Sequence, residues 1–503
     1  PLLLTGMTAI KFNNPTADAK GSVNTDVSEG WYDYEAKEWA NAQTEDGSLW
    51  VWIPRFAYKI TYYTDAAKEN ESADKTQYGS IDVKFLVGTI DQYYDEATGK
   101  LETAVRAKTA NDEIDATKNY VVHPAFTDES SSELNYANGG WDKELTGIWV
   151  SKFEAGYASG NNSAPVKASS VKYTQTSAVA NTAETGTGAD GTLPARNWLD
   201  GEYGKKEGNS YTWLNGEVSI KYPTFQGKTY AMNYININDA FNITKVLNES
   251  GNIYGLSTDS DSHLMKNSEW GAVVYLGQSQ YGLNGTNVYV NNANLNNSTE
   301  SVYAVTGMCS AESTDKTEVT TTIENINSIE GNTPQNNLYT WDQLNGQKAS
   351  STGTIYGVYD MSGGTWERTA GYVANGNGNL KSYGRSLAYE GETLKTGSTK
   401  YTTVYPNSSN DKSGTTSTMD ELSQENYEAN TKVYGDGIRE TSIQGTSNKG
   451  WNSDYSLFPA LNNPFSMRGG YYNAGSFAGL FAFYRTNGNS YSYIGFRAVL
   501  CAQ

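Results

Sequence analysis

The stretch "GVYDMSGGTWERTAGY", Gly357–Tyr372, holds the sequence signal that decides the fold. Gly363 and Gly364 permit tight turns with positive φ, which most other residues avoid. Asp360 and Ser362 have short polar side chains that can hydrogen-bond a turning backbone. The stretch therefore predicts a compact turn that holds a folded domain together, rather than a catalytic loop.

The second half of this stretch predicts a buried charge. Trp366 is a large apolar side chain suited to filling a core, and Glu367 follows it directly. A carboxylate that is buried beside such a ring needs a cationic partner. Arg468 and Arg497, near the end of the chain, are the candidate partners.

Working outward, two segments upstream have the apolar and aromatic composition of strands. "SLWVWIPRFAYKITYY", Ser48–Tyr63, is the stronger signal, and its Pro54 marks a bend or an edge position. "TGIWVSKFEAGYAS", Thr146–Ser159, is the second. Two helices are expected, near 236–249 with Asn236 as the N-cap and near 267–277 with Gly277 as the stop.

Long polar stretches separate these elements, near 158–225, 285–345 and 390–455. None has enough regularly spaced apolar residues to close a core of its own, so we interpret them as insertions in one domain. That domain is expected over 46–503. Residues 1–45 are expected to form a small β segment that attaches the domain to whatever precedes it.

Composition excludes several classes of function. The net charge of −19 repels phosphate and argues against a nucleic-acid partner. No apolar run approaches the roughly 18 residues of a membrane helix, so this segment is expected to make no membrane contact. His123 and His263, the two histidines, are too few for a His-rich metal site. Cys309 and Cys501 could form a disulfide or remain buried thiols.

The order of five segments along the chain carries a family resemblance. "WVWIPRF", "GIWVSKFEAGY", "HLMKNSEWGAVVYL", "GVYDMSGGTWERTAGY" and "RGG…IGFRAVL" follow one another along the chain. This series resembles the formylglycine-generating-enzyme (sulfatase-modifying factor) type of the C-type lectin fold. The third segment is similar to that family's "LPTEAEWEYAA" helix, and Gly357–Arg368 is similar to its "GLYDMSGNVWEW" turn.

The resemblance covers roughly residues 46–503 and implies a fold. It implies an α+β, C-type-lectin-like domain with two helices, small antiparallel sheets and long polar insertions. It also implies that the C-terminal strand, Ile494–Leu500, lies near the Trp50–Phe56 strand, which closes the domain.

The same resemblance argues against the chemistry of the family's enzymes. Copper-dependent members need two cysteines a few residues apart, and Ala498 stands where one would be expected. The calcium-dependent lectin motifs EPN, QPD and WND are absent from the sequence. We therefore expect no enzyme activity and no required cofactor, although carbonyls and Asp or Asn side chains could hold a structural Ca²⁺. An enzyme of the formylglycine-generating family remains the less favoured alternative.

A second group with this scaffold is the variable proteins of diversity-generating retroelements, which occur in phages, prophages and cells. Their Asn codons near the C-terminus are randomised at the adenines inside a frame that resembles "RGG…G…AG.F……IGFR". Such randomisation cannot produce Trp, Met, Lys, Glu or Gln, and residues 471–493 contain none of these. The resemblance thus implies a variable region within 467–500. An unvaried adhesin or lectin-like module remains the alternative.

The composition of this region suits binding in either case. Tyr offers broad contact area at low conformational-entropy cost, and Ser, Asn and Gly add adaptable hydrogen bonds. We expect one mostly exposed ligand-binding surface, with Arg485 as its charged hot spot and Leu480, Phe481 and Ile494 in the core. Its expected members are Tyr471, Asn473, Ser476, Phe477, Phe483, Tyr484, Arg485, Asn487, Asn489, Tyr491, Ser492 and Tyr493.

These expectations combine into one functional hypothesis. The chain is expected to be a receptor-binding protein on the surface of a cell or a virion. Its partner would be a protein or a glycan on another cell or virus. An upstream anchor of a pilin-like or virion type could carry it.

Overall fold

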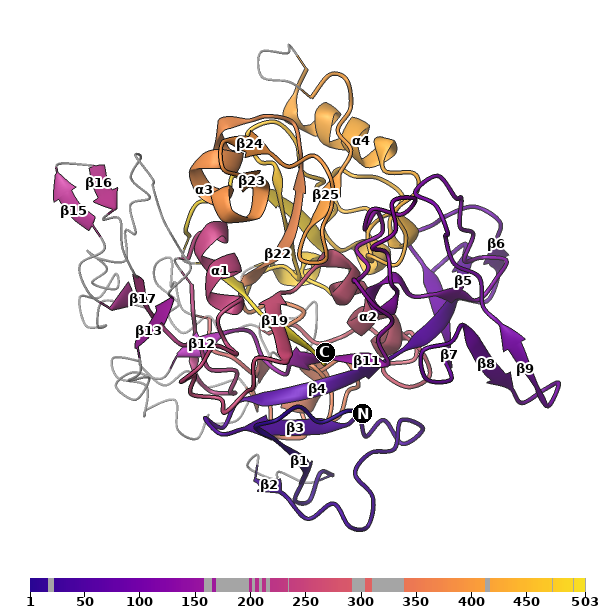
Figure 1. The fold of residues 1–503 in the computed structure, drawn as a ribbon. Coiled ribbons are helices and arrows are strands. Elements are labelled where there is room, and N and C mark those ends of the chain that lie inside the picture. Colours follow the sequence, from indigo (N-terminus) through magenta and orange to yellow (C-terminus); the bar gives the residue numbers. More distant parts are fainter. Residues whose placement is uncertain are drawn as a thin grey trace.

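The computed structural model shows an α+β protein whose two largest sheets are linked by helices (Figure 1). The structure describes residues 1–16, 22–157, 218–233, 235–291, 304–309, 339–411, 417–472, 474–491 and 493–502, with four short strands between 165 and 213. None of the helices in this described part combines the length and the apolarity of a membrane span.

The largest sheet has seven strands and brings both ends of the chain together (Figure 1). Its order is β19 (Ser260–Leu264), β29 (Ala498–Ala502), β11 (Gly147–Ser151), β4 (Leu49–Pro54), β3 (Asn41–Thr44), β1 (Met7–Phe12) and β2 (Val23–Asn24). The run of bulky apolar residues in β4 and β11 suits strands that are covered on both faces, and both are almost entirely buried. Residues 1–45, expected to be a separate attachment segment, therefore contribute strands to the sheet of the main domain.

The C-terminal strand differs from the expectation in two ways. The predicted strand 494–500 is divided at Arg497 into β28 (Ile494–Phe496) and β29. β29 pairs with β11 and β19, so β11 lies between it and β4. The expected closure of the domain does occur, but through β11 rather than by direct neighbourhood with β4.

The second sheet contains the second half of the Gly357–Tyr372 stretch, in strand β22 (Trp366–Val373). Its strands are β25 (Thr403–Tyr405), β22, β26 (Phe465–Arg468) and β27 (Phe483–Thr486), and β28 also pairs with β22. β22 pairs antiparallel with β26 but parallel with β25 and β28. The expected small antiparallel sheets are present elsewhere in the described chain, and this sheet adds two parallel pairings, because the chain returns to β22 through long connections.

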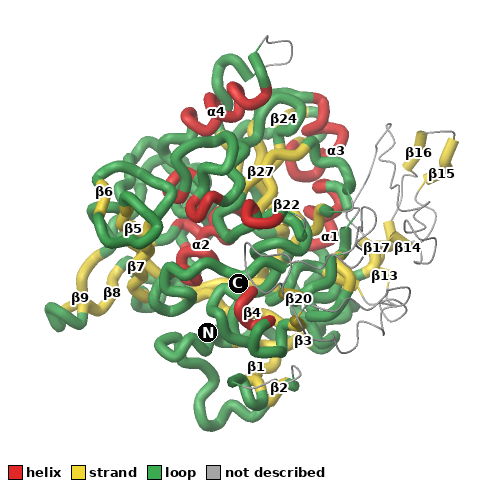
Figure 2. The backbone as a smooth tube through the Cα atoms, turned by 180° about the vertical axis from the view of Figure 1, so that it is seen from behind, coloured by secondary structure: helices red, strands yellow, loops and turns green. Residues whose placement is uncertain are grey.

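The remaining strands form small antiparallel sheets. Arg55 separates β4 from β5, so the expected bend at Pro54 divides the predicted strand between two sheets. The hairpin of β8 and β9 projects from the body of the molecule in both views (Figures 1 and 2). One sheet contains β10 (Val121–Val122), β5 (Phe56–Tyr63), β6 (Glu71–Ser72) and β7 (Gly79–Phe85). A three-stranded sheet contains β13 (Pro165–Ala168), β17 (Val218–Lys221) and β14 (Leu199–Asp200). The two-stranded sheets are β8 (Gln92–Asp95) with β9 (Lys100–Thr103), β12 (Gly156–Tyr157) with β18 (Tyr230–Ala231), β15 (Gly204–Glu207) with β16 (Ser210–Trp213), β20 (Met308–Cys309) with β21 (Tyr339–Thr340), and β23 (Tyr389–Glu390) with β24 (Thr393–Leu394).

Both expected helices are present. α1 spans Ile237–Thr244, and its N-cap Asn236 accepts a hydrogen bond from the Asp239 N–H over 2.9 Å. The helix ends before the predicted boundary at 249. α2 spans Asn267–Gln278, one residue beyond the predicted stop, and all of its residues are buried.

The structure contains two further helices in its described part, so the expectation of two helices is wrong. α4 (Met419–Ala429) lies in the polar stretch 390–455, where Thr418 and Glu421 form a capping box. That pattern was legible in the sequence. α3 (Gly378–Ala388) contains Gly384 in a non-helical conformation, and its glycines conceal it from propensity arguments. Figure 2 shows α3 and α4 at the same end of the molecule, near β22 and β27.

The apolar core lies on both faces of the seven-stranded sheet. One cluster includes Trp50, Trp149 and Phe241, and a second includes Trp270 and Val273 of α2. Residues of 390–455 also pack inward: Tyr405 and Tyr427 share a smaller cluster with strand residues of the second sheet. This stretch is therefore packed against the domain, although its sequence is mostly polar.

Candidate functional site

The site is organised by β22, where alternate residues point to opposite faces. Trp366 is paired with Ile494 and lies in a cluster with it, whereas Glu367 is paired with Gly495 and turns to the interior. The two neighbouring residues thus belong to two regions: an aromatic one at the surface and a charged one inside.

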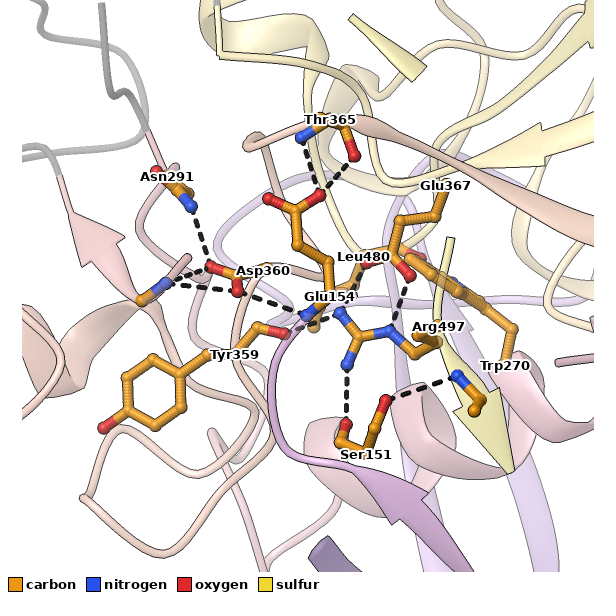
Figure 3. Close-up of polar contacts among 12 residues, drawn as sticks. Ser151, Glu154, Trp270, Asn291, Tyr359, Asp360, Thr365, Glu367, Leu480 and Arg497 are labelled. Carbon is orange, nitrogen blue, oxygen red and sulfur yellow. Dashed lines mark hydrogen bonds and ion pairs between the residues drawn. The ribbon is translucent and has the colours of Figure 1, made fainter. Parts of the chain in front are cut away.

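The interior region contains the ion pair between Glu367 and Arg497 (Figure 3). The Nε of Arg497 donates to Oε2 of Glu367 over 2.6 Å, and Nη2 contacts Oε1. The remaining guanidinium donors reach the carbonyls of Ser151, at 3.0 Å, and Tyr359, at 2.8 Å. Burial raises the pKa of Glu367 to about 7, against the opposing pull of Arg497. Of the two expected partners, Arg497 is the one that pairs.

Two further carboxylates lie beside this pair (Figure 3). Asp360 accepts hydrogen bonds from Nδ2 of Asn291, at 2.7 Å, and from the Gly307 N–H, at 2.8 Å. Glu154 accepts from the N–H and the hydroxyl of Thr365. Burial, then the nearby Asp360 and Glu367, raises the pKa of Glu154 well above its usual value. This shift favours the protonated form of Glu154. We call Glu154, Asp360, Glu367 and Arg497 the charge network.

Arg468 has a different structural role. Its guanidinium donates to the carbonyls of Ala482, at 3.0 Å, and of Asp436 and Gly437, each at 2.7 Å. It also lies 5.5 Å from the centre of the Trp270 ring. Arg468, the last residue of β26, thereby links this strand to Asp436 and Gly437. These contacts hold in place the start of the connection formed by residues 469–493.

The surface region consists of aromatic rings in mutual contact. Tyr455 lies 5.1 Å from Phe477 and 5.8 Å from Tyr484 between ring centres. Tyr484 lies 5.2 Å from Trp366, the ring that supports the group from below. Tyr471, Tyr491 and Tyr493 form a second chain of contacts, with 5.4 Å between Tyr471 and Tyr493 and 5.5 Å between Tyr491 and Tyr493. We call Tyr455, Tyr471, Phe477, Tyr484, Tyr491 and Tyr493 the aromatic surface.

Most of the expected binding residues lie in or beside this surface, but they are less exposed than expected. Ser476 is exposed and Phe477 is 37% exposed. All the others that can be described, except Phe483, are half-buried, namely Tyr471, Tyr484, Arg485, Asn487, Asn489, Tyr491 and Tyr493. Asn473 and Ser492 lie outside the described residues. The expected core positions Leu480, Phe481 and Ile494 are buried, as predicted.

Phe483 and Arg485 contradict the expectation. Phe483 is buried and packs with Phe458 and Tyr405, because alternation along β27 turns it away from Tyr484. Arg485 forms an ion pair with Asp420 over 2.6 Å, and its other donors reach α4. It is thus engaged within the fold and is not an unpaired charge offered to a ligand.

Asn487 and Asn489 form hydrogen bonds that stabilise the connection between β27 and β28. Asn487 accepts a hydrogen bond from the Asn489 N–H at 3.0 Å and donates to the Tyr491 hydroxyl at 3.3 Å. The carbonyl of Asn489 accepts from the buried guanidinium of Arg368. These contacts hold the connection between β27 and β28 in shape, which places Tyr491 and Tyr493.

Sequence reasoning missed Tyr455. It is the last residue of the polar stretch 390–455, which we interpreted as an insertion, yet its N–H donates to the Phe477 carbonyl at 3.1 Å. The alternation in "DYSLF", Asp454–Phe458, was the available signal.

The described residues hold no group of three or more His, Cys, Asp or Glu side chains arranged to bind a metal. Cys309 and Cys501 are both buried, and they are not joined in a disulfide. Burial raises the pKa of both thiols, which makes them unreactive at neutral pH.

Comparison with known proteins adds no family assignment. No family model matches the chain, and no curated protein sequence matches it.

Proposed function

We propose that the chain is a receptor-binding protein of a cell or virion surface, and that the aromatic surface is its binding site. The proposal includes the C-type-lectin-like scaffold of the formylglycine-generating-enzyme type and the relation to variable proteins of diversity-generating retroelements. The protein would bind a protein or glycan ligand and would catalyse no reaction.

The observation that carries this proposal is the arrangement of the tyrosines. Five half-buried tyrosines pack against one buried cluster, which consists of Trp366, Met467, Ala482 and Ile494. The more exposed Phe477 joins them through its contact with Tyr455. Because neighbouring rings restrict one another, little side-chain freedom is left to lose on binding. Tyr is also the residue that binding loops use most for contact area.

The glycines of the 469–493 connection also support the proposal, because they determine its backbone path separately from the aromatic side chains. Gly470 has φ of 80°, and a Cβ there would lie 2.6 Å from Ala478. At Gly479, a Cβ would lie 2.1 Å from the carboxylate of Asp454. Glycines therefore set the path of the connection, and the rings between them can change without altering that path. A diversified site needs this separation.

The site we propose is smaller than the one expected from the sequence. It comprises Tyr455, Tyr471, Ser476, Phe477, Tyr484, Tyr491 and Tyr493. Phe483 and Arg485 are excluded because their side chains are engaged within the fold.

A binding experiment tests the proposal. Labelled protein would be applied to a glycan array and to a panel of bacterial cells, beside the triple variant Tyr471→Ala, Tyr491→Ala, Tyr493→Ala. We expect the variant to lose at least tenfold in apparent affinity, since aromatic anchors dominate interfaces. The matched control replaces Tyr32 and Tyr94, which are 46% and 58% exposed elsewhere. Equal binding by the triple variant and the wild type would refute the proposal.

The genomic neighbourhood tests the retroelement part separately. We expect a reverse-transcriptase gene and a near-copy of the 3′ end of this gene, with adenines at the varied positions. A neighbourhood without either would leave an unvaried adhesin, and the binding experiment would still decide whether the aromatic surface is the site.

A further inference from the structure

A cavity of about 340 Å³ lies between two segments far apart in the sequence. One side follows β5 and β6 and includes Tyr62, Lys75 and Asp115, and the other comprises Lys432, Arg439 and Glu440. Its lining includes no residue of the aromatic surface. We call it the basic pocket. In Figure 1, the gold segment beside α4 meets the indigo and purple segments around β5 and β6 in this part of the molecule.

Two cationic groups are held close together in this pocket. Nζ of Lys75 donates to the Arg439 carbonyl over 2.7 Å, and the two charged groups lie 5.7 and 4.6 Å from the centre of the same ring, Tyr427. Nη1 of Arg439 donates to the Tyr427 carbonyl. Desolvation, then the neighbouring Arg439, lowers the pKa of Lys75 to about 8. The two positive charges therefore repel one another.

The carboxylates of the pocket do not neutralise these charges by contact. Asp115 pairs with Lys118, at 2.7 Å, outside the group of lining residues. Glu440 accepts hydrogen bonds from the hydroxyls of Tyr58, at 2.9 Å, and Tyr275, at 2.8 Å. Within the described chain, no carboxylate lies within ion-pair distance of Lys75, Arg439 or Lys432.

We propose that the basic pocket binds the oxyanion group of a small acidic ligand, about the size of an acidic monosaccharide. A protein with net charge −19 has carboxylates in excess, so adjacent basic groups left without one are unusual. An oxyanion would relieve the repulsion and accept hydrogen bonds from both groups. The cavity is near the lower limit of volume for small-molecule sites, which suits a single sugar-sized ligand. Lys432, whose Nζ donates to the Asn111 carbonyl at 3.0 Å, would contribute from the rim.

Titration calorimetry of the full chain tests this inference, with sodium glucuronate and glucose as a matched pair of probes. The measurement is made at low ionic strength and at pH 6.5, where Lys75 is protonated. We expect glucuronate to bind and glucose not to bind. Sodium sulfate, as a third probe, distinguishes the sources of the charge: binding of sulfate alone would support a site for a free oxyanion. No heat with either anion, or equal binding of glucose and glucuronate, would overturn the inference.

Variants locate the site. Lys75→Gln and Arg439→Gln should each weaken anion binding by about tenfold or more, because each removes a charged hydrogen-bond donor. Lys100→Gln, an exposed lysine on β9, removes the same charge elsewhere and should leave the affinity unchanged. Thermal unfolding of each variant shows whether it is folded. An equal loss in Lys100→Gln would mean that only net charge matters, and the inference would fail.

Discussion

The charge network and the aromatic surface share β22, yet they are stabilised in opposite ways. Glu367 is buried and forms its ion pair with one partner, Arg497. Trp366, the preceding residue, supports several rings that also contact one another. The network is thus a set of specific pairs, in which each group leaves another uncompensated when it is removed. The rings of the aromatic surface make several contacts with one another, so the replacement of one ring should leave the others supported.

The most disruptive test of this comparison removes Arg497. Arg497→Met should destabilise the fold by about 3–5 kcal/mol, because Glu367 and its neighbouring carboxylates would remain buried without a cation. Urea unfolding measures the change. Lys381→Gln, which breaks the exposed pair with Glu392, is the control and should have little effect. Similar stabilities for the two variants would show that the network contributes nothing specific.

A second test compares two aromatic residues of the C-terminal connection. Phe483→Ala should cost about 3–5 kcal/mol as a core truncation, whereas Tyr491→Ala should cost about 1 kcal/mol for lost ring contacts. The free energies of unfolding of the two variants, each measured against the wild type, test this difference. If Tyr491→Ala were as damaging as Phe483→Ala, the aromatic surface would be core and unsuited to variation.

The pH dependence of stability provides a third test. Burial raises the pKa of Glu367 to about 7 and that of Asp360 to about 6, above the values these groups have in an unfolded chain. The folded state thus holds more protons between pH 5 and 8, and its stability should fall as the pH rises through this window, by on the order of 1–3 kcal/mol.

Thermal unfolding at pH 5 and pH 8 measures this fall. In Glu154→Gln, which leaves Glu367 and Asp360 in place, the fall should persist. Glu367→Gln should reduce the fall, and Glu96→Gln, at an exposed carboxylate, should not. A wild type that is more stable at pH 8 would contradict the assignment of these protons.

The smallest expected effect concerns Ser476. It is exposed beside Phe477, so Ser476→Lys should change the stability by less than about 0.5 kcal/mol. Ser490→Lys, the matched control in the same connection, places a charge at a buried position and should destabilise clearly. Calorimetric unfolding of both variants would show whether exposure alone determines which positions can vary.

Local patterns predicted much of this architecture. The strands around Trp50 and Trp149, the cap at Asn236 and the helix near 267–277 were legible because their apolar spacing and caps are local properties. The sequence did not predict helix α3, nor that Arg485 would be engaged within the fold and so excluded from the binding site. The first contains Gly384, and the second depends on Asp420 in a distant helix.

The sequence by itself determined that Trp366 would be buried and that Glu367 would need an arginine. It could not determine which arginine pairs, which rings face outward, or that Tyr455 joins them. Only the tertiary structure decided these points, because they depend on parallel pairing of β22 with β28 and on packing of the 417–458 stretch against β27. Alternation along a strand determines that two neighbours face opposite sides, but the surroundings determine which side is solvent.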